Sequence, residues 1–224
     1  MSRILQSLNT EIEIPYSALP GVIGNLRGAL YQIRLENRHI LAAEIPEWDD
    51  TPGYLRRRTI PVRIAQQLGV ETALLLGCGK SLESRQGLVV VENHINLLGD
   101  NPLIGKNPDA LGDRFPDMTS VYSTDFQEKL LHLITNLFNR EVNTGILVAH
   151  NRPEDLTAEE QGALRQTGSC YFSTDIIPEA IAARHGKMRI GGVLSAASNQ
   201  QGKINEQAAQ QIKSVMLAAL SEIF

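Results

Sequence analysis

The chain has 224 residues, of which 42% are hydrophobic and 21% are charged. These proportions are close to the globular average, so they exclude wholesale disorder and allow a full core. The 25 acidic and 21 basic residues give a formal net charge of -4, which argues against a general nucleic-acid binder because such proteins usually carry a basic face. The length is ordinary for an α/β domain, and we expect residues 1–224 to form a single domain.

The composition also bears on compartment and metal binding. Cys78 and Cys170 are far apart and have no CxxC spacing, so neither a disulfide framework nor a structural zinc site is expected. The N-terminal segment lacks an apolar core of signal-peptide length, and no apolar run approaches the roughly 20 residues that span a bilayer. The five histidines show no metal-ligand spacing. We therefore expect a soluble cytoplasmic protein that binds neither metal nor membrane.

The first third of the chain is rich in predicted strands. Residues 28–35 and 39–45 are apolar runs separated by a polar turn, which is the pattern of a β-hairpin. Thr59, followed by a proline in the first turn and a glycine at residue 69, predicts a helix with a threonine N-cap. We interpret the basic cluster at residues 56–58 as the solvated start of this helix. A contact with phosphate or an acidic partner is the alternative.

Aliphatic strands then alternate with helices. Continuous runs typical of strands covered on both faces lie at residues 72–76, 88–91, 145–149 and 190–197. Helices are expected at residues 124–138, 157–166, 178–186 and 204–224. Thr157 and Glu160 form a possible capping box for the second of these helices. The alternation predicts an α/β fold with a mixed central β-sheet flanked by helices, and sites are then expected beyond the carboxyl ends of the strands.

Several short motifs have both a chemical and a structural interpretation. Gly77–Ser81 contains GKS after a strand, but a nucleotide loop of the GxxxxGK[ST] type requires glycine where Leu74 stands. A glycine turn that donates N–H groups to an anion is the remaining functional interpretation. Cys78 is either a nucleophile in this loop or a small buried residue. His185 is interpreted as a helix-end histidine that interacts with the helix dipole.

Residues 91–122 form the most distinctive stretch, which is polar and rich in glycine and proline. Structureless loops longer than about 12–15 residues are uncommon in compact domains and are often functional. The clustered charges of Asp113, Arg114 and Asp117 are expected either to lock this loop or to form an oligomer contact.

This stretch resembles the trimeric purine nucleoside phosphorylase and methylthioadenosine phosphorylase family. Its runs NHINL, NPL and GDRFPDM follow that family's order, at residues 93–97, 101–103 and 112–118, with Tyr122 after them. The helices predicted near Thr59 and Pro178 also resemble family segments, and the resemblance covers the chain from about residue 13. It implies a mixed-sheet α/β fold, a homotrimer, and phosphorolysis of purine nucleosides to free base and ribose 1-phosphate.

The chain departs from this family where the family binds phosphate. The family's opening glycine-rich loop has no counterpart, so we interpret the chain as a divergent, N-terminally shortened member. Val22 stands at the family's PGH histidine, and an arginine and a histidine of the family are absent from the stretch at residues 46–52. Acidic residues make that stretch negative, which would repel a phosphate. Losing such contacts usually costs several kcal/mol of transition-state stabilisation, roughly a factor of 10³ in rate.

The resemblance also implies where a ligand would bind, although it assigns no catalytic residue. The candidates are Glu154, Ser198 and Asn199 at the purine base, Thr174 and Asp175 near the ribose, and Gly79, Lys80 and Ser81 at an anion. No cofactor is expected, and phosphate would be a co-substrate if the protein is active.

Three hypotheses about function follow. The first is a family member with impaired or lost phosphorolysis that binds a purine nucleoside or base. The second is an active divergent enzyme that cleaves the N-glycosidic bond, either as a phosphorylase or as a nucleosidase with Asp50 or Asp175 as the base. The third is a structural partner of another subunit. A protein can retain its fold after its functional site has been lost, so the fold by itself does not distinguish among the three hypotheses.

Overall fold

A closed barrel forms the centre of the computed structural model, which describes residues 9–19, 27–45, 51–83, 85–197 and 206–224. The strands follow one another around it in the order β4, β7, β6, β5 and β8. Their bounds are Thr72–Ser81 for β4, Gly87–Asn96 for β5, Asn143–Ala149 for β6, Ser169–Phe172 for β7 and Arg189–Ala197 for β8. Parallel and antiparallel pairs both occur. The predicted mixed α/β fold is confirmed, whereas closure into a barrel was not foreseen.

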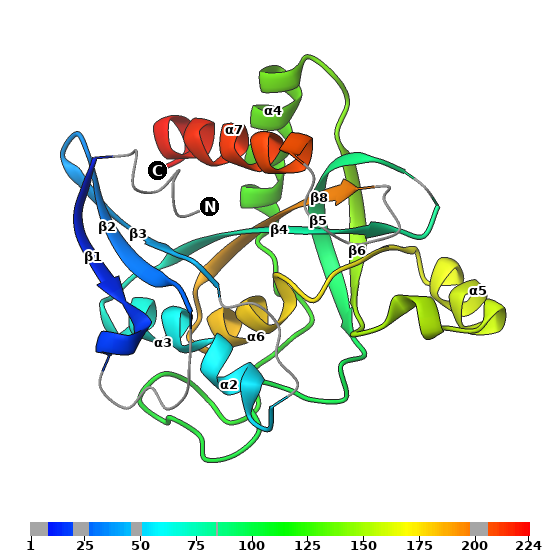
Figure 1. The fold of residues 1–224 in the computed structure, drawn as a ribbon, viewed down its shortest axis with the longest axis horizontal. Coiled ribbons are helices and arrows are strands. Elements are labelled where there is room, and N and C mark those ends of the chain that lie inside the picture. The colour runs from blue at the N-terminus through cyan, green and yellow to red at the C-terminus, as the bar shows by residue number, and fades with distance from the viewer. Residues whose placement is uncertain (1–8, 20–26, 46–50, 84, 198–205) are drawn as a thin grey trace.

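A smaller antiparallel sheet lies beside the barrel (Figure 1). It consists of β1 (Thr10–Pro15), β2 (Ala29–Leu35) and β3 (Arg38–Ala43). The β2–β3 pair confirms the predicted hairpin, and Glu36 in its turn has a φ of 52°. Tyr31 and Ile33 of β2 are buried in a cluster that includes Met216. This sheet is therefore packed onto the main domain.

Helices cover the barrel on two sides (Figure 1). One side carries α4 (Thr124–Phe138) and α7 (Glu206–Glu222), and the other carries α2 (Tyr54–Arg58), α3 (Ile60–Gln67) and α6 (Ile177–His185). The remaining helical segments are α5 (Ala158–Gln166), η1 (Tyr16–Ala18) and η2 (Pro153–Asp155). The predicted capping box of α5 is confirmed, because the Thr157 hydroxyl accepts the Glu160 N–H at 3.2 Å.

The two helical layers bury opposite faces of the same strands. In β5, Leu88 and Val90 belong to a cluster with Phe126 of α4, whereas Val89 and Val91 belong to a cluster with residues of α6. Successive side chains of a strand point to opposite faces, so a strand covered on both faces must be apolar throughout. This explains the continuous aliphatic runs.

The predicted turn at Gly77–Ser81 is wrong, because β4 continues through all five residues. Lys80 is paired with Phe172 of β7, and this pairing brings the two strands into close contact. A Cβ on Gly79 would overlap the carbonyl oxygen of Phe172. The glycine therefore permits close approach inside the sheet, which a local turn signal cannot distinguish from a loop.

The predicted helix after Thr59 is confirmed as α3, with Thr59 at the N-cap position and a proline in the first turn, although the short helix α2 precedes it. The Thr59 hydroxyl donates to the Leu55 carbonyl at 3.0 Å and makes no N-cap hydrogen bond. Arg58 is only 2% exposed, so the interpretation of residues 56–58 as a solvated cluster fails at this residue. The third arginine points into the protein, where it meets two carboxylates.

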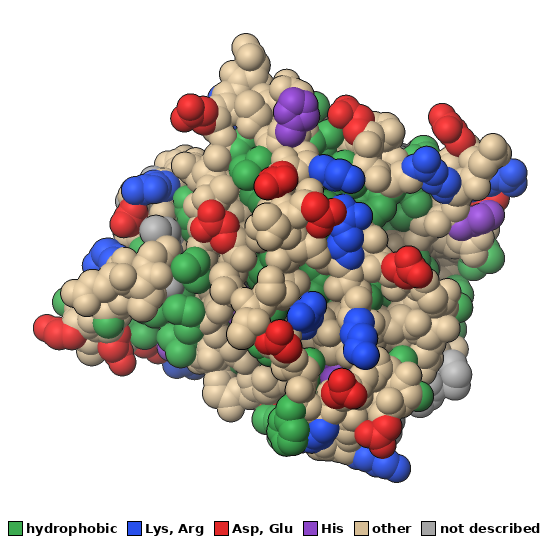
Figure 2. Space-filling model, turned by 180° about the vertical axis from the view of Figure 1, so that it is seen from behind, with side chains coloured by type: hydrophobic (Ala, Val, Ile, Leu, Met, Phe, Trp, Pro, Cys, Tyr) green, Lys and Arg blue, Asp and Glu red, His purple; other side chains and the backbone are tan. Residues whose placement is uncertain are grey.

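Charges of both signs are mixed over the face seen in Figure 2. Within the described ranges, no helix is long and apolar enough to cross a membrane. The same part of the chain holds no group of three His, Cys, Asp or Glu side chains placed to share a metal ion.

Candidate functional site

Several of the predicted site residues come together where three strands end. Lys80 in β4 is paired with Phe172 of β7 and with Ala197 of β8. Its ammonium nitrogen lies 3.7 Å from a carboxylate oxygen of Glu154, in the turn after β6. The structure therefore brings the anion candidate and a base candidate into one group. The segments that follow β7 and β8 start at the same edge.

Other candidates at this edge differ in their surroundings. The Ser81 hydroxyl accepts the N–H groups of Glu83 at 3.1 Å and Arg85 at 3.0 Å, so it stabilises the turn after β4. Thr174 is half-buried in the bend between β7 and α6. The other positions considered in the sequence analysis lie outside the described residues, namely Val22, Asp50, Ser198, Asn199 and residues 46–49.

A buried ion cluster lies next to this edge and was missed by the sequence reasoning. The Arg58 Nε donates to Glu179 at 2.5 Å, and its Nη2 donates to Asp175 at 3.0 Å. The side chains of Arg58 and Glu179 are each 2% exposed, whereas that of Asp175 is 40% exposed. The cluster therefore joins the interior to the surface at the start of α6.

The pKa values in the cluster follow from burial and from mutual attraction. Burial would lower the pKa of Arg58, but the carboxylates of Glu179 and Asp175 overcome this and raise it. Burial raises the pKa of Glu179, and Arg58 offsets only part of that rise. The guanidinium is thus charged at neutral pH and is the fixed centre of the cluster.

One sequence signal could have identified this cluster. Glu179 is a lone acid in IPEAIAA, an otherwise apolar first part of a helix. A carboxylate in such a setting is rarely buried without a paired cation. The signal indicates that a partner exists, but it does not identify Arg58, which is 121 residues away in the chain.

The backbone between β7 and α6 places Asp175 against β4. Ser173 donates to the Cys78 carbonyl at 2.7 Å and accepts the Asp175 N–H at 3.0 Å. The Cys78 N–H in turn donates to the second carboxylate oxygen of Asp175 at 3.3 Å. These bonds hold the carboxylate at a defined position beside β4.

Cys78 itself is not suited to nucleophilic catalysis. Burial, together with the nearby charge of Asp175, raises the pKa of its thiol to about 11. A nucleophilic cysteine requires the thiolate form. The structural interpretation of this residue is therefore favoured.

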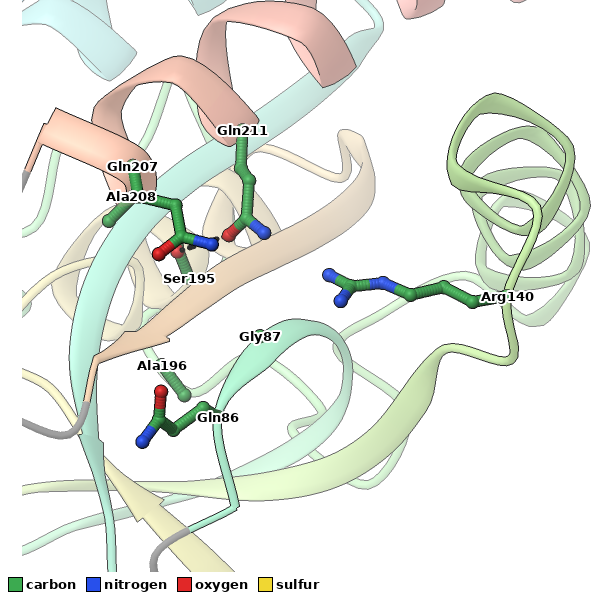
Figure 3. A pocket seen from close by; sticks show the side chains of 8 residues that line it. All are labelled: Gln86, Gly87, Arg140, Ser195, Ala196, Gln207, Ala208 and Gln211. Carbon is green, nitrogen blue, oxygen red and sulfur yellow. Dashed lines mark hydrogen bonds between the residues drawn. The ribbon is translucent and has the colours of Figure 1, made fainter.

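A polar cavity of about 110 Å³ lies beside β8 and the start of α7 (Figure 3). Gln207 and Gln211 of α7 border it, and Arg140 reaches toward it from the opposite side. The Ser195 hydroxyl donates to Gln211 at 3.3 Å. Cavities are the usual first place to look for a ligand, but none of the candidate residues that the structure describes lines this cavity.

The loop after β5 is anchored to α6, which agrees with the first of the two roles predicted for its clustered charges. Arg114 donates to the Leu103 carbonyl at 2.6 Å, and Arg184 donates to the Asp117 carbonyl at 2.8 Å. His185 is buried at the helix end, with Nε2 2.9 Å from the side-chain oxygen of Asn107. These contacts confirm the locking role.

His94 at the end of β5 predicts a loss of stability in mild acid. Its Nδ1 lies 3.3 Å from the Tyr122 hydroxyl, and burial lowers its pKa from 6.5 to about 4. Between these values the unfolded chain binds a proton that the folded chain does not, so stability falls as the pH drops through this window. The free energy of unfolding should decrease by about 2 kcal/mol from this residue between pH 7 and pH 5.

Urea denaturation at pH 7 and pH 5 tests this expectation. His94→Gln should flatten the pH dependence by that amount, whereas His132→Gln, at an exposed position on α4, should leave it unchanged. Equal pH dependence in wild type and His94→Gln would contradict the assignment.

Comparison with known proteins agrees with this architecture. The phosphorylase superfamily model matches residues 2–223. Purine nucleoside phosphorylase 1 of Geobacillus stearothermophilus is 32% identical over 213 residues, which cover 91% of this chain and 76% of that protein. Purine nucleoside phosphorylase of Bos taurus is 28% identical over 235 residues, which cover 93% of this chain and 78% of that protein.

Solved structures show the same fold. A purine nucleoside phosphorylase in complex with ribose-1-phosphate aligns with a TM-score of 0.81 and 23% identity, over 99% of this chain and 86% of that one. The Schistosoma mansoni enzyme in complex with inosine aligns with a TM-score of 0.74 and 22% identity, over 97% and 84%. Because the family model matches residues 2–223 and the Geobacillus protein is 32% identical over 91% of this chain, the chain belongs to the purine nucleoside phosphorylase family.

Proposed function

We propose that this protein binds a purine nucleoside or purine base and catalyses phosphorolysis weakly or not at all. The binding site is the strand-end group that contains Lys80, Glu154 and Asp175. Family membership supports the ligand class, since solved relatives are described in complex with inosine, guanosine and hypoxanthine. The convergence of candidate residues at this edge supports its location.

The pairing of the cations at this edge supports impaired phosphorolysis. Lys80 is bound by Glu154, and Arg58 is bound by Asp175 and Glu179. The group thus has three carboxyl groups for two cations. A phosphate dianion needs charge-assisted hydrogen bonds from unengaged donors. Here it would have to displace carboxylates that are already in place.

Glu154 is the residue proposed to contact the base. Its side chain is 63% exposed, and a carboxylate can accept an N–H from a purine ring. Glu154→Gln should weaken binding of the nucleoside or base at least tenfold, since hydrogen bonds to a charged group are about twice as strong as neutral ones. The neighbouring Asp155→Asn is the matched control. If Glu154→Gln binds as tightly as wild type, Glu154 is not at the base.

Base release is the direct test of the activity. Inosine, guanosine, adenosine and methylthioadenosine would each be incubated with the purified protein, with and without phosphate, and the products separated by chromatography. We expect binding by calorimetry with release at least about 10³-fold slower than a working phosphorylase. Rapid release that depends on phosphate would overturn the proposal. Equal release without phosphate would identify a nucleosidase, and absence of both binding and release would favour a structural partner.

We also propose a homotrimer in the cytoplasm. The family resemblance implies the trimer, and Phe115, 87% exposed, and Ile104, 56% exposed, lie on the anchored loop where a subunit contact would bury them. Light scattering on the assay sample should give three times the chain mass of 24.6 kDa. The compartment is supported by the absence of a CxxC spacing and by the free thiol of Cys78.

A further inference from the structure

The contacts of Asp175 are those of a bound anion. One carboxylate oxygen accepts from the Arg58 guanidinium at 3.0 Å, and the other accepts from the backbone N–H of Cys78 at 3.3 Å. A guanidinium and a backbone N–H are donors that proteins use for phosphate and other oxyanions. The two donors come from different elements, α2 and β4, and Asp175 lies between them.

Two backbone features, at Gly77 and Ile176, hold the Asp175 carboxylate between these two donors. A Cβ on Gly77 would lie 2.8 Å from the Asp175 Cβ, so only glycine allows this approach of the segment to β4. Ile176, the next residue, has a φ of 76°. A β-branched residue rarely adopts this conformation, and such outliers persist only where the surrounding structure enforces them. The position of Asp175 is thus enforced from both sides.

Neutralising Arg58 is not a sufficient reason for Asp175. Glu179 already supplies a buried carboxylate at 2.5 Å from the guanidinium. Its second oxygen, Oε2, is buried and has no hydrogen-bond partner among the described residues. Asp175, by contrast, is 40% exposed. A second carboxylate at the solvent-facing side of Arg58 occupies the position from which an external anion would approach.

We infer that the carboxylate of Asp175 is a built-in anion, which fills an oxyanion position between Arg58 and the Cys78 N–H and so excludes inorganic phosphate. Asp175 is therefore a specificity-determining residue. The inference rests on the proposed function, since it concerns the same strand-end group. It assigns the exclusion of phosphate to the charge of one residue, Asp175.

Two variants test the inference by phosphate binding alone. Asp175→Asn removes the charge and keeps the shape, and Asp175→Ser removes the carboxylate and leaves space. Binding of inorganic phosphate would be measured by calorimetry and by ³¹P line broadening. We expect at least tenfold tighter phosphate binding in Asp175→Ser than in wild type, with a smaller gain in Asp175→Asn. Asp155→Asn, an exposed acid in η2, should bind phosphate as wild type does.

The outcomes separate this inference from the proposed function. Thermal melting would first show that the variants fold. Two different substitutions are used so that the test can still be made if one variant does not fold. No gain in either folded variant, or phosphate binding by wild type equal to that of Asp175→Ser, overturns the inference. Nucleoside binding measured without phosphate tests the proposed function separately. If Asp175→Ser binds phosphate more tightly but the protein binds no nucleoside, the inference holds and the proposed function is overturned.

Discussion

Replacing Arg58 with methionine should lower the free energy of unfolding by about 3–5 kcal/mol, because it leaves a buried carboxylate without its cation. The side chain of Glu179 is 2% exposed, and its carboxylate is paired with the guanidinium of Arg58. Methionine keeps an apolar stem of similar length, so the loss reports the charge. Urea denaturation at pH 7, followed by circular dichroism, measures it.

Two further variants control this measurement. Arg56→Met, at an exposed position of the same helix, should change stability by no more than about 0.5 kcal/mol, as surface substitutions usually do. Adding Glu179→Gln to Arg58→Met should recover part of the loss, since the uncompensated charge is then removed. A loss below 1 kcal/mol in Arg58→Met would show that the ion cluster is not a structural element.

Replacing Gly79 with alanine should destabilise the protein by about 3 kcal/mol, because overpacking against backbone cannot be relieved by a side-chain movement. The added methyl group would overlap the Phe172 carbonyl oxygen where β4 and β7 close the barrel. Thermal and urea denaturation measure the effect. Reduced yield of soluble protein is expected as well.

Gly162→Ala is the matched control, since a Cβ there meets nothing within 4 Å. Gly162 lies within α5, and alanine in a helix is favoured over glycine by up to about 1 kcal/mol. This variant should therefore be as stable as wild type or slightly more so. If Gly79→Ala behaves in the same way, close contact between β4 and β7 is not required.

Elements with strong local signals were predicted well from the sequence. The helix at residues 124–138 has the predicted bounds, because its apolar residues recur at helical spacing and Phe126 and Leu130 are fully buried. The hairpin and the α5 capping box were likewise readable, since turn and cap chemistry involve residues only a few positions apart. The family motif in residues 93–122 identified the fold class through a resemblance, which the comparisons confirm.

The candidate site was only partly predictable. Lys80, Glu154 and Asp175 were named as candidates from the sequence; in the structure Lys80 is paired with Glu154, and Asp175 accepts the Cys78 N–H of the same strand. Arg58 was missed, because an arginine at the third position of a basic run has the pattern of a solvated charge. Its burial depends on α6, more than 100 residues further along the chain.

The amino-acid pattern thus specified the family, the alternation of strands and helices, and the residues able to carry chemistry. The three-dimensional packing specified which charges are paired: Arg58 with Glu179 and Asp175, and Lys80 with Glu154. The reason is physical. Periodicity, caps and turns act over a few residues, whereas burial of a charge and close approach of two strands depend on segments that only folding brings together.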